Sequence, residues 1–462
     1  MYQEDTIAAV ATGMTESGIG IIRISGKDSI KVGNKIFRTA SGKSILETVE
    51  SHTFHHGFAV DKKDHIIDEV MIVVMKAPKS YTGEDTVEIH CHGGVLVMQK
   101  ILETSINAGA RLAEPGEFSK RAFLNGKMDL SKAEAVMDVI HSQNEYALSS
   151  SVNQLRGILS EKVKGLREKI LYEIAFIESA LDDPEHVSFD GYSDDLFLKI
   201  KEMLYVLEKL INSAEDGKLI KEGINTVIIG KPNVGKSSLL NILVGEERAI
   251  VTDIAGTTRD ILQETIKLHG ITLNIIDTAG IRNTEDAVEK IGVEKALMYA
   301  ENSDLILYVV DVSSELDEND KNILSLLNDK KVIVLLNKSD LSAIIKEDDL
   351  KEFIPEDVRI IRTSAVDHRG FDEFEETVEN MFFQGQIKSN NEIVITNVRH
   401  KVALQEAFDS LNLVKKSIED GMSEDFYSID LMSAYASLGR IIGEEVDDDL
   451  VEEIFSKFCL GK

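Results

Sequence analysis

The sequence predicts a multi-domain α/β protein in which a parallel-sheet domain is inserted into a helical domain. A chain of 462 residues is too long for one hydrophobic core. Short apolar runs alternate with helical segments in the second half of the chain, which is typical of a buried parallel sheet. Helical periodicity flanks that region on both sides, so we expect the two flanking parts to close on each other as one domain.

The first half of the chain divides into two expected segments. Residues 1–125 mix β-rich runs with one helix near 95–108, which predicts a small α+β domain. Residues 126–222 are expected to form the first part of the helical domain. Apolar residues recur there at steps of three or four residues between 129 and 181, which predicts one long helix or a helical pair. A further helix is expected from about 195 to 217.

The second half divides likewise. Residues 223–381 are expected to form the inserted α/β domain, and residues 382–462 the second part of the helical domain. In that last segment, Gly421 is expected to end a helix, and a final helix precedes the C-terminus.

The bulk composition restricts compartment and partners. A formal charge of −30 repels polyanions, so contact with a nucleic acid must be local or assisted by a partner. The absence of a long apolar run predicts no membrane span, and the acidic start lacks the basic region of a signal peptide. We therefore expect a cytoplasmic protein. Cys91 and Cys459 lie far apart in sequence, which gives little support to a disulfide framework.

Residues 230–237, Gly-Lys-Pro-Asn-Val-Gly-Lys-Ser, fit the phosphate-loop pattern. They follow an apolar strand and precede a helix, which is the context that the pattern requires. Backbone N–H groups of such a loop converge on phosphates, Lys236 adds a positive charge, and the Ser237 hydroxyl binds Mg²⁺.

Three more motifs follow at expected strand ends. Residues 277–280, Asp-Thr-Ala-Gly, match the segment that reaches Mg²⁺ and the γ-phosphate. Residues 337–340, Asn-Lys-Ser-Asp, match a guanine-binding motif, because the Asp340 carboxylate accepts two hydrogen bonds from the guanine edge. Residues 363–365, Thr-Ser-Ala, are expected to close the base pocket. Four motifs in this order predict a Ras-like P-loop GTPase domain.

One expected catalytic group is missing. Ras-like enzymes carry a water-orienting glutamine where this chain has Ile281.

The segment 252–260 is similar to the switch segment of the MnmE (TrmE) family of tRNA-modifying GTPases, and Asn233 matches its companion asparagine. The resemblance covers nearly the whole chain, and further matching segments are residues 6–9, 23–26, 81–85, 115–118 and 459–462.

The resemblance implies a K⁺ ion that replaces an arginine finger. Its implied ligands are Asn233, Thr252, Ile254 and Thr257, neutral oxygens that suit a hard monovalent cation, while Ser237 and Thr258 bind Mg²⁺. The motifs and the resemblance together imply the nucleotide contacts Asn233, Val234, Gly235, Lys236, Ser237, Ser238, Thr252, Asp253, Ile254, Ala255, Gly256, Thr257, Thr258, Asp277, Thr278, Ala279, Gly280, Asn337, Lys338, Asp340, Ser364 and Ala365.

The resemblance also implies catalytic residues. Glu289 matches the family's catalytic glutamate, which orients the attacking water; the alternative is a solvated helix residue. Arg259 and Arg282 are candidates to stabilise the switch segments, although surface arginines often have no measurable effect.

The N-terminal domain resembles the folate-binding fold of aminomethyltransferases. This implies a homodimer that holds a tetrahydrofolate derivative, 5,10-methylene- or 5-formyl-tetrahydrofolate, in a pocket lined by Arg23, Glu84, Lys127 and Lys462. A carboxylate can bind the amide and amine edge of a pteridine, and basic side chains suit its polyglutamate tail.

The two cysteines are interpreted separately. His90, Cys91 and His92 form a possible metal motif, but strand alternation places Cys91 opposite the histidines. Cys459 stands in the terminal Cys-Leu-Gly-Lys segment, where a nucleophilic or thiol-relay role and a role as a small buried apolar residue both remain open.

The resemblance implies a process and leaves two rivals. With the flavoprotein MnmG, which alone carries FAD, a K⁺-stimulated, Mg²⁺-dependent GTP hydrolase of this family modifies C5 of the wobble uridine at position 34 of certain tRNAs to an aminomethyl or carboxymethylaminomethyl group. A heterotetramer with MnmG is expected; glycine and ammonium remain alternatives as nitrogen donor. The rivals are a regulatory GTPase of ribosome assembly and a one-carbon transferase with a scaffold GTPase domain.

Overall fold

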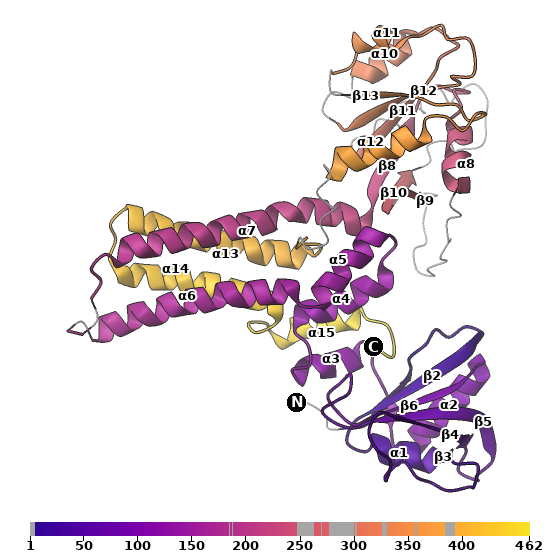
Figure 1. Ribbon diagram of the computed structural model, residues 1–462, viewed down its shortest axis with the longest axis vertical. Helices are drawn as coiled ribbons and strands as arrows, with labels where there is room; N and C mark the ends of the chain where they lie inside the picture. The colour runs from indigo at the N-terminus through magenta and orange to yellow at the C-terminus, as the bar shows by residue number, and fades with distance from the viewer. Residues whose placement is uncertain are drawn as a thin grey trace. The chain divides into compact units, whose positions relative to one another are not determined.

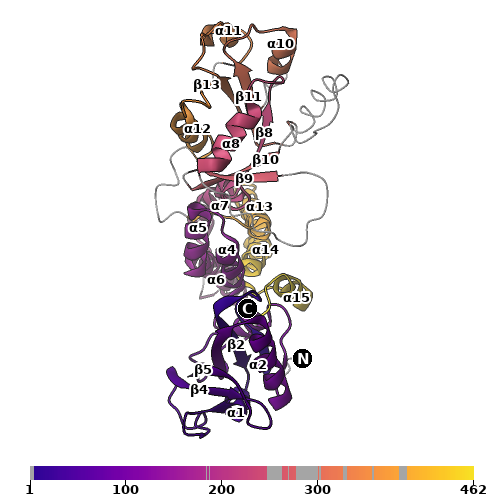
Figure 2. The same ribbon diagram turned by 90° about the vertical axis from the view of Figure 1, so that its right-hand side faces the viewer.

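The computed structural model describes residues 5–183, 185–186, 188–246, 263–268, 270–276, 300, 303–325, 330–355, 358–383 and 393–462 (Figures 1 and 2). The chain forms two compact units. Unit 1 comprises Met1–Met137, Gln154–Ile200 and Asp409–Lys462; unit 2 comprises Asp138–Asn153 and Lys201–Phe408. Both units are therefore assembled from segments that are distant in sequence.

Unit 1 contains a seven-stranded sheet in the order β3-β4-β5-β6-β2-β1-β7. Neighbouring strands are antiparallel except β1 and β7, which are parallel. Helices α1 (Ser29–Ile36) and α2 (Val95–Ala108) pack on the sheet, and the shared core contains Ile22, Ile72 and Ile89. The strands are β1 Ile7–Val10, β2 Ser17–Ser25, β3 Phe37–Arg38, β4 Thr53–Val60, β5 Ile66–Met75, β6 Thr86–Gly93 and β7 Arg111–Leu112.

The C-terminal segment of unit 1 returns to its N-terminal sheet. Helix α15 (Asp448–Ser456) packs against α3 (Glu117–Leu124), which begins at Gly116. Gly116 has φ 69°, and a Cβ atom there would lie 2.2 Å from the Phe455 carbonyl oxygen. Its N–H donates to the Cys459 carbonyl at 3.4 Å. This close approach, which only glycine permits, sets the C-terminal tail beside the first strands.

Most of unit 2 is an α/β domain with a six-stranded sheet in the order β13-β12-β11-β8-β10-β9. Only β9 runs antiparallel to its neighbour. Helices α8 and α12 contribute to the core on one face, and α10 and α11 to a second core that contains Tyr308. The elements are β8 Ile224–Ile229, α8 Lys236–Glu246, β9 Gln263–Leu268, β10 Ile271–Ile276, β11 Leu305–Asp311, α10 Glu318–Ser325, β12 Val332–Asn337, α11 Glu347–Lys351, β13 Arg359–Arg362 and α12 Phe371–Phe383.

Helical residues of unit 2 are joined to strand β10. The Asn144 side-chain amide donates to the Ile220 carbonyl at 3.1 Å and to the Thr272 hydroxyl at 3.0 Å. The Asn274 amide donates to the Glu222 carbonyl at 2.7 Å. The α/β domain is thus attached at the end of α7 and at the start of α5. The remaining helices are α4 Leu130–His141, α5 Glu145–Leu155, α6 Ile158–Asp182, α7 Tyr192–Glu222, α13 Val398–Glu419 and α14 Glu424–Ile442.

The structure confirms the predicted helix at 95–108 but corrects two other expectations. Residues 5–125 contain two helices besides α2, namely α1 and α3, and the stretch from 129 to 181 forms three helices rather than one or two. Asn144 starts α5 by accepting the Ala147 N–H at 2.7 Å, and Gly157, with φ 89°, separates α5 from α6. Within the described ranges, no helix combines the length and apolar composition needed to cross a bilayer.

Candidate functional site

The predicted nucleotide motifs lie at one edge of the sheet of unit 2. Parallel strands β8, β11, β12 and β13 pair in register, with Asp311 opposite Asn337 and Leu336 opposite Arg362. Their carboxyl ends therefore meet, and each is followed by a polar segment. The phosphate loop follows β8, which lies between β11 and β10, where the strand order reverses; ligands of open α/β sheets bind at such a point.

The phosphate loop turns sharply at two glycines. Gly230 has φ 156°, and a Cβ atom there would lie 2.4 Å from the Val309 carbonyl oxygen. Gly235 has φ 99°, and a Cβ atom would lie 2.3 Å from the Asn337 amide nitrogen. Asn233 between them adopts φ 64°, a conformation uncommon for residues other than glycine, and its side chain is exposed. The loop backbone therefore folds tightly against two neighbouring strand ends.

Lys236 and the two serines after it occupy the first turn of α8. The Lys236 ammonium donates to the carbonyl oxygens of Gly230 at 2.7 Å and Lys231 at 2.6 Å. Ser237 and Ser238 are exposed. An N-terminal helix turn with a lysine and exposed hydroxyls is suited to bind a phosphate and a divalent cation.

Asn337 joins the guanine-binding motif to the phosphate loop. Its amide nitrogen donates to the Val234 carbonyl at 2.8 Å, and its amide oxygen accepts the Thr363 hydroxyl at 3.3 Å. Its side chain is almost fully buried. Because a buried amide is costly when unpaired, these bonds hold the loop and both base motifs in one arrangement.

Asp340 and Lys338, the side chains expected to contact a guanine base, each have a side-chain partner. Ser364 donates its hydroxyl to the exposed Asp340 carboxylate at 2.7 Å, and Ala365 beside it is half-buried. Lys338 pairs with Asp311 at 2.6 Å. Burial alone would raise the pKa of Asp311, but bonds from Lys338 and Ser313 outweigh it and lower that pKa. Sequence reasoning missed Asp311, although it ends a core strand as the other motifs do.

Several predicted nucleotide, K⁺, Mg²⁺ and catalytic residues lie outside the described residues. They are Thr252, Asp253, Ile254, Ala255, Gly256, Thr257, Thr258, Arg259, Asp277, Thr278, Ala279, Gly280, Ile281, Arg282 and Glu289. The described part of the site therefore comprises the phosphate loop and the base-binding segments.

A second candidate site lies in unit 1, where Arg23 meets the C-terminal tail. Its guanidinium pairs with Glu88 at 2.7 Å, donates to the Gly461 carbonyl at 3.1 Å and lies 5.3 Å from the centre of the Tyr81 ring. The Lys462 ammonium lies 5.9 Å from the centre of the same ring. Burial, and then the nearby charge of Arg23, lowers the pKa of Lys462. Two predicted folate-binding residues thus lie over one aromatic ring.

The other two predicted folate-binding residues flank the neighbouring loop. Glu84 accepts hydrogen bonds from the Ser25 hydroxyl at 2.8 Å and from Arg121 at 3.2 Å. Lys127 donates to the Pro78 carbonyl at 2.9 Å. Neither Tyr81 nor Arg121 was predicted as a site residue, although Tyr81 begins the matching segment 81–85.

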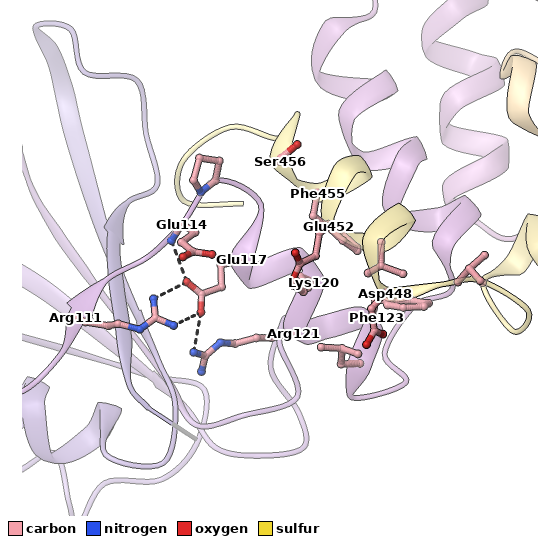
Figure 3. Close-up of a pocket in the computed structure, with 15 residues that line it drawn as sticks. Arg111, Glu114, Glu117, Lys120, Arg121, Phe123, Asp448, Glu452, Phe455 and Ser456 are labelled. Carbon is pink, nitrogen blue, oxygen red and sulfur yellow. Dashed lines mark hydrogen bonds and ion pairs between the residues drawn. The ribbon is translucent and has the colours of Figure 1, made fainter. Parts of the chain in front are cut away.

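A separate cavity of about 850 Å³ opens between α3 and α15 (Figure 3). On one side Glu117 accepts hydrogen bonds from Arg111 at 2.5 and 2.8 Å and from Arg121 at 2.9 Å. Burial would raise the pKa of Glu117, but these bonds and the Glu114 N–H lower it. None of the predicted site residues lines this cavity.

The two cysteines differ in environment. Cys91 is buried and its thiol donates to the Gly20 carbonyl at 3.4 Å; burial raises its pKa to about 11. His92 is exposed on the other face of the strand, as alternation predicts, and pairs with Asp68. Among the described residues, no group of three His, Cys, Asp or Glu side chains is placed to hold a metal ion. Cys459 is exposed, which contradicts the alternative of a buried apolar residue.

Comparisons with known proteins cover nearly the whole chain. Residues 6–127 match the family described as GTP-binding protein TrmE N-terminus, and residues 130–459 match the MnmE helical domain. The chain is 56% identical over 458 residues to a tRNA modification GTPase MnmE of Lachnoclostridium phytofermentans, with 99% of each chain covered. It is 48% identical over 466 residues to a tRNA modification GTPase MnmE of Clostridioides difficile, with 100% of each covered.

Among solved structures, the G domain of the T. maritima FeoB iron transporter is 28% identical, with 34% of this chain and 96% of that chain covered and a TM-score of 0.25. The family matches and the sheet topology described above confirm the predicted fold class, with an N-terminal α+β domain, a helical domain and an inserted P-loop GTPase domain.

The exposure of the cysteines predicts that one thiol reacts with a disulfide reagent such as DTNB under native conditions. Cys459 should react quickly because it is exposed, whereas Cys91 should react only on unfolding because its thiolate is buried and disfavoured. Absorbance measurements should show that Cys459→Ser removes the fast phase and Cys91→Ser retains it. A fast phase that survives in Cys459→Ser would contradict the assignment.

Proposed function

Because this chain belongs to the MnmE family of tRNA modification GTPases, we propose that its GTP hydrolysis is stimulated by K⁺, requires Mg²⁺ and drives modification of C5 of the wobble uridine at position 34 of certain tRNAs. The product is an aminomethyl or carboxymethylaminomethyl group, made with the flavoprotein MnmG and a tetrahydrofolate one-carbon donor. The observation that carries the proposal is the Asn337 bridge between the phosphate loop and the base-binding segments.

The described residues fit a guanine nucleotide with Mg²⁺. Lys236 and the N–H groups of the first turn of α8 bind the phosphates, and the exposed Ser237 hydroxyl binds Mg²⁺. Asp340, oriented by Ser364, accepts hydrogen bonds from the guanine edge, and Lys338 supports the base pocket.

Asn233 fits the proposed K⁺ site, because its side chain is exposed on the loop and offers a neutral amide oxygen. When bound, K⁺ supplies positive charge against the phosphates in place of an arginine finger. The further ligands Thr252, Ile254 and Thr257, the Mg²⁺ ligand Thr258, and the catalytic roles of Glu289 and Arg259 belong to this proposal.

The cluster of Arg23, Tyr81 and Lys462 in unit 1 fits a folate. Arg23 and Lys462 present two cations over the Tyr81 ring, which suits an aromatic ligand with carboxylates. Glu84 accepts bonds from the pteridine edge, and Lys127 lies beside the same loop. The folate supplies the carbon that is transferred. Exposed Cys459, three residues before Lys462, is proposed as a catalytic thiol.

We assign the protein to the cytoplasm as a homodimer that binds MnmG and tRNA. Its charge of −30 disfavours unassisted tRNA binding over the general surface, so a partner that contributes positive charge is expected to bring the tRNA. The attachment of α5 and α7 to β10 gives the GTPase domain a direct connection to helical residues of unit 2.

GTP hydrolysis should be at least about tenfold faster in K⁺ than in Na⁺, which corresponds to about 1.4 kcal/mol of barrier. The smaller Na⁺ fits a cage of neutral oxygens less well. Steady-state phosphate release, measured for wild type and Asn233→Ala, should show that the variant loses the K⁺ stimulation. Its GDP affinity, measured with Mg²⁺ present, should remain. Equal wild-type rates in both salts would refute the K⁺ role, and loss of GDP binding in the variant would make Asn233 structural.

Mass analysis of wobble uridines in a strain that lacks this gene tests the proposed process. The modified uridine should disappear and return when the wild-type gene is restored. A Lys236→Ala gene should not restore it, because the variant lacks the phosphate-binding ammonium. Unchanged wobble uridines in the deleted strain would contradict the proposal.

A further inference from the structure

The phosphate loop has a second attachment besides Asn337. Lys231, the loop's second residue, directs its ammonium to two carboxylates of the segment that starts α10. It lies 2.8 Å from the Asp317 carboxylate and also pairs with Asp320. Burial would lower the pKa of Lys231, but these two partners outweigh it and raise that pKa. The loop lysine is therefore charged and held.

Asp320 is the buried member of this cluster. It is only 4% exposed, whereas the Asp317 side chain is 53% exposed. Its two oxygens have different partners: one accepts the Tyr308 hydroxyl at 2.6 Å, and the other accepts the Asp317 N–H at 3.1 Å. Tyr308 is fully buried in strand β11. A buried carboxylate with fixed donors is a rigid point to which a mobile lysine side chain can be attached.

Lys231 connects this rigid point to the phosphate-binding lysine. Its side chain pairs with Asp320, while its carbonyl oxygen accepts the Lys236 ammonium at 2.6 Å. On the other side of the loop, Asn337 holds the Val234 carbonyl. The segment between these attachments includes Asn233. Lys231 therefore holds the conformation of the first half of the loop, and Asn337 holds the conformation of its second half.

We propose that Asp320 is a positioning residue for the GTPase reaction. Through its pair with Lys231, Asp320 holds the first half of the phosphate loop in the conformation that binds the nucleotide. This inference rests on the proposed function in taking residues 230–237 as the phosphate loop. Without the pair between Lys231 and Asp320, the loop becomes ordered only when the nucleotide binds. Because that ordering costs free energy, the affinity of the loop for the phosphates falls. A purely structural role, in which Asp320 only caps α10 and receives Tyr308, predicts no specific effect on the nucleotide.

Dissociation constants and dissociation rates of a fluorescent GDP analogue distinguish these roles. Asp320→Asn keeps an acceptor for Tyr308 but removes the buried one of the two carboxylates that pair with Lys231. We expect it to weaken GDP binding about five- to tenfold, mainly through faster dissociation. Lys231→Met loses the pairs with both Asp317 and Asp320 and should weaken GDP binding at least as much. The double variant should bind GDP no more weakly than Lys231→Met, because Lys231→Met already lacks the pair with Asp320.

Tyr308→Phe is the matched control. It removes the hydroxyl that donates to Asp320 and leaves the pair with Lys231, so the temperature of thermal unfolding should fall while GDP affinity stays within about twofold of wild type. Lys231→Arg should restore most of the affinity lost in Lys231→Met, since a guanidinium can also pair with the carboxylate.

Three results would overturn the positioning role: wild-type affinity in Asp320→Asn, an equal loss in Tyr308→Phe, or additive losses in the double variant. Lys236→Ala separates this inference from the proposed function. If Lys236→Ala retains full GDP affinity, the phosphate-loop assignment itself fails. If it abolishes binding while Asp320→Asn is unaffected, only the positioning role fails.

Discussion

The nucleotide site depends on one buried side-chain amide. Asn337 ends strand β12, and its amide joins the phosphate loop after β8 to Thr363 after β13. Three segments separated by up to about 130 residues of sequence thereby share one set of hydrogen bonds. Leaving the buried amide unpaired costs about 1–3 kcal/mol, so displacing one of the three segments also destabilises the positions of the other two. The parallel sheet makes this possible by bringing the strand ends to one edge.

A comparable constraint shapes the cluster around Arg23 in unit 1. Gly116 lets α15 approach the start of α3, and the tail that follows reaches strand β1, where a Cβ atom on Gly461 would lie 2.4 Å from the Val10 carbonyl oxygen. The Arg23 guanidinium donates a hydrogen bond to the Gly461 carbonyl. Cys459, Gly461 and Lys462 therefore lie beside residues from the first part of the chain.

Sequence reasoning identified what is encoded locally. The order of strand, loop and helix at residues 224–246, the helix at 95–108 and the strands before residues 337 and 363 follow from short patterns, and the structure confirms these elements. It missed partners that only folding brings together, such as Asp311 for Lys338 and Asp320 for Lys231. Those aspartates resemble any exposed acid in the sequence, because their burial depends on strands and helices far along the chain. Periodicity likewise continued through Gly157, where the helix breaks.

The central claim is that these segments form one guanine nucleotide site, and base selectivity of Asp340→Asn tests it most directly. In the proposed site the Asp340 carboxylate accepts two hydrogen bonds from guanine, whereas the amide of Asp340→Asn would donate to the C2 oxygen of xanthine. Titration of wild type and variant with fluorescent GDP and xanthosine diphosphate should show that the wild type prefers GDP and that Asp340→Asn prefers xanthosine diphosphate. An unchanged preference for GDP in the variant would contradict the account.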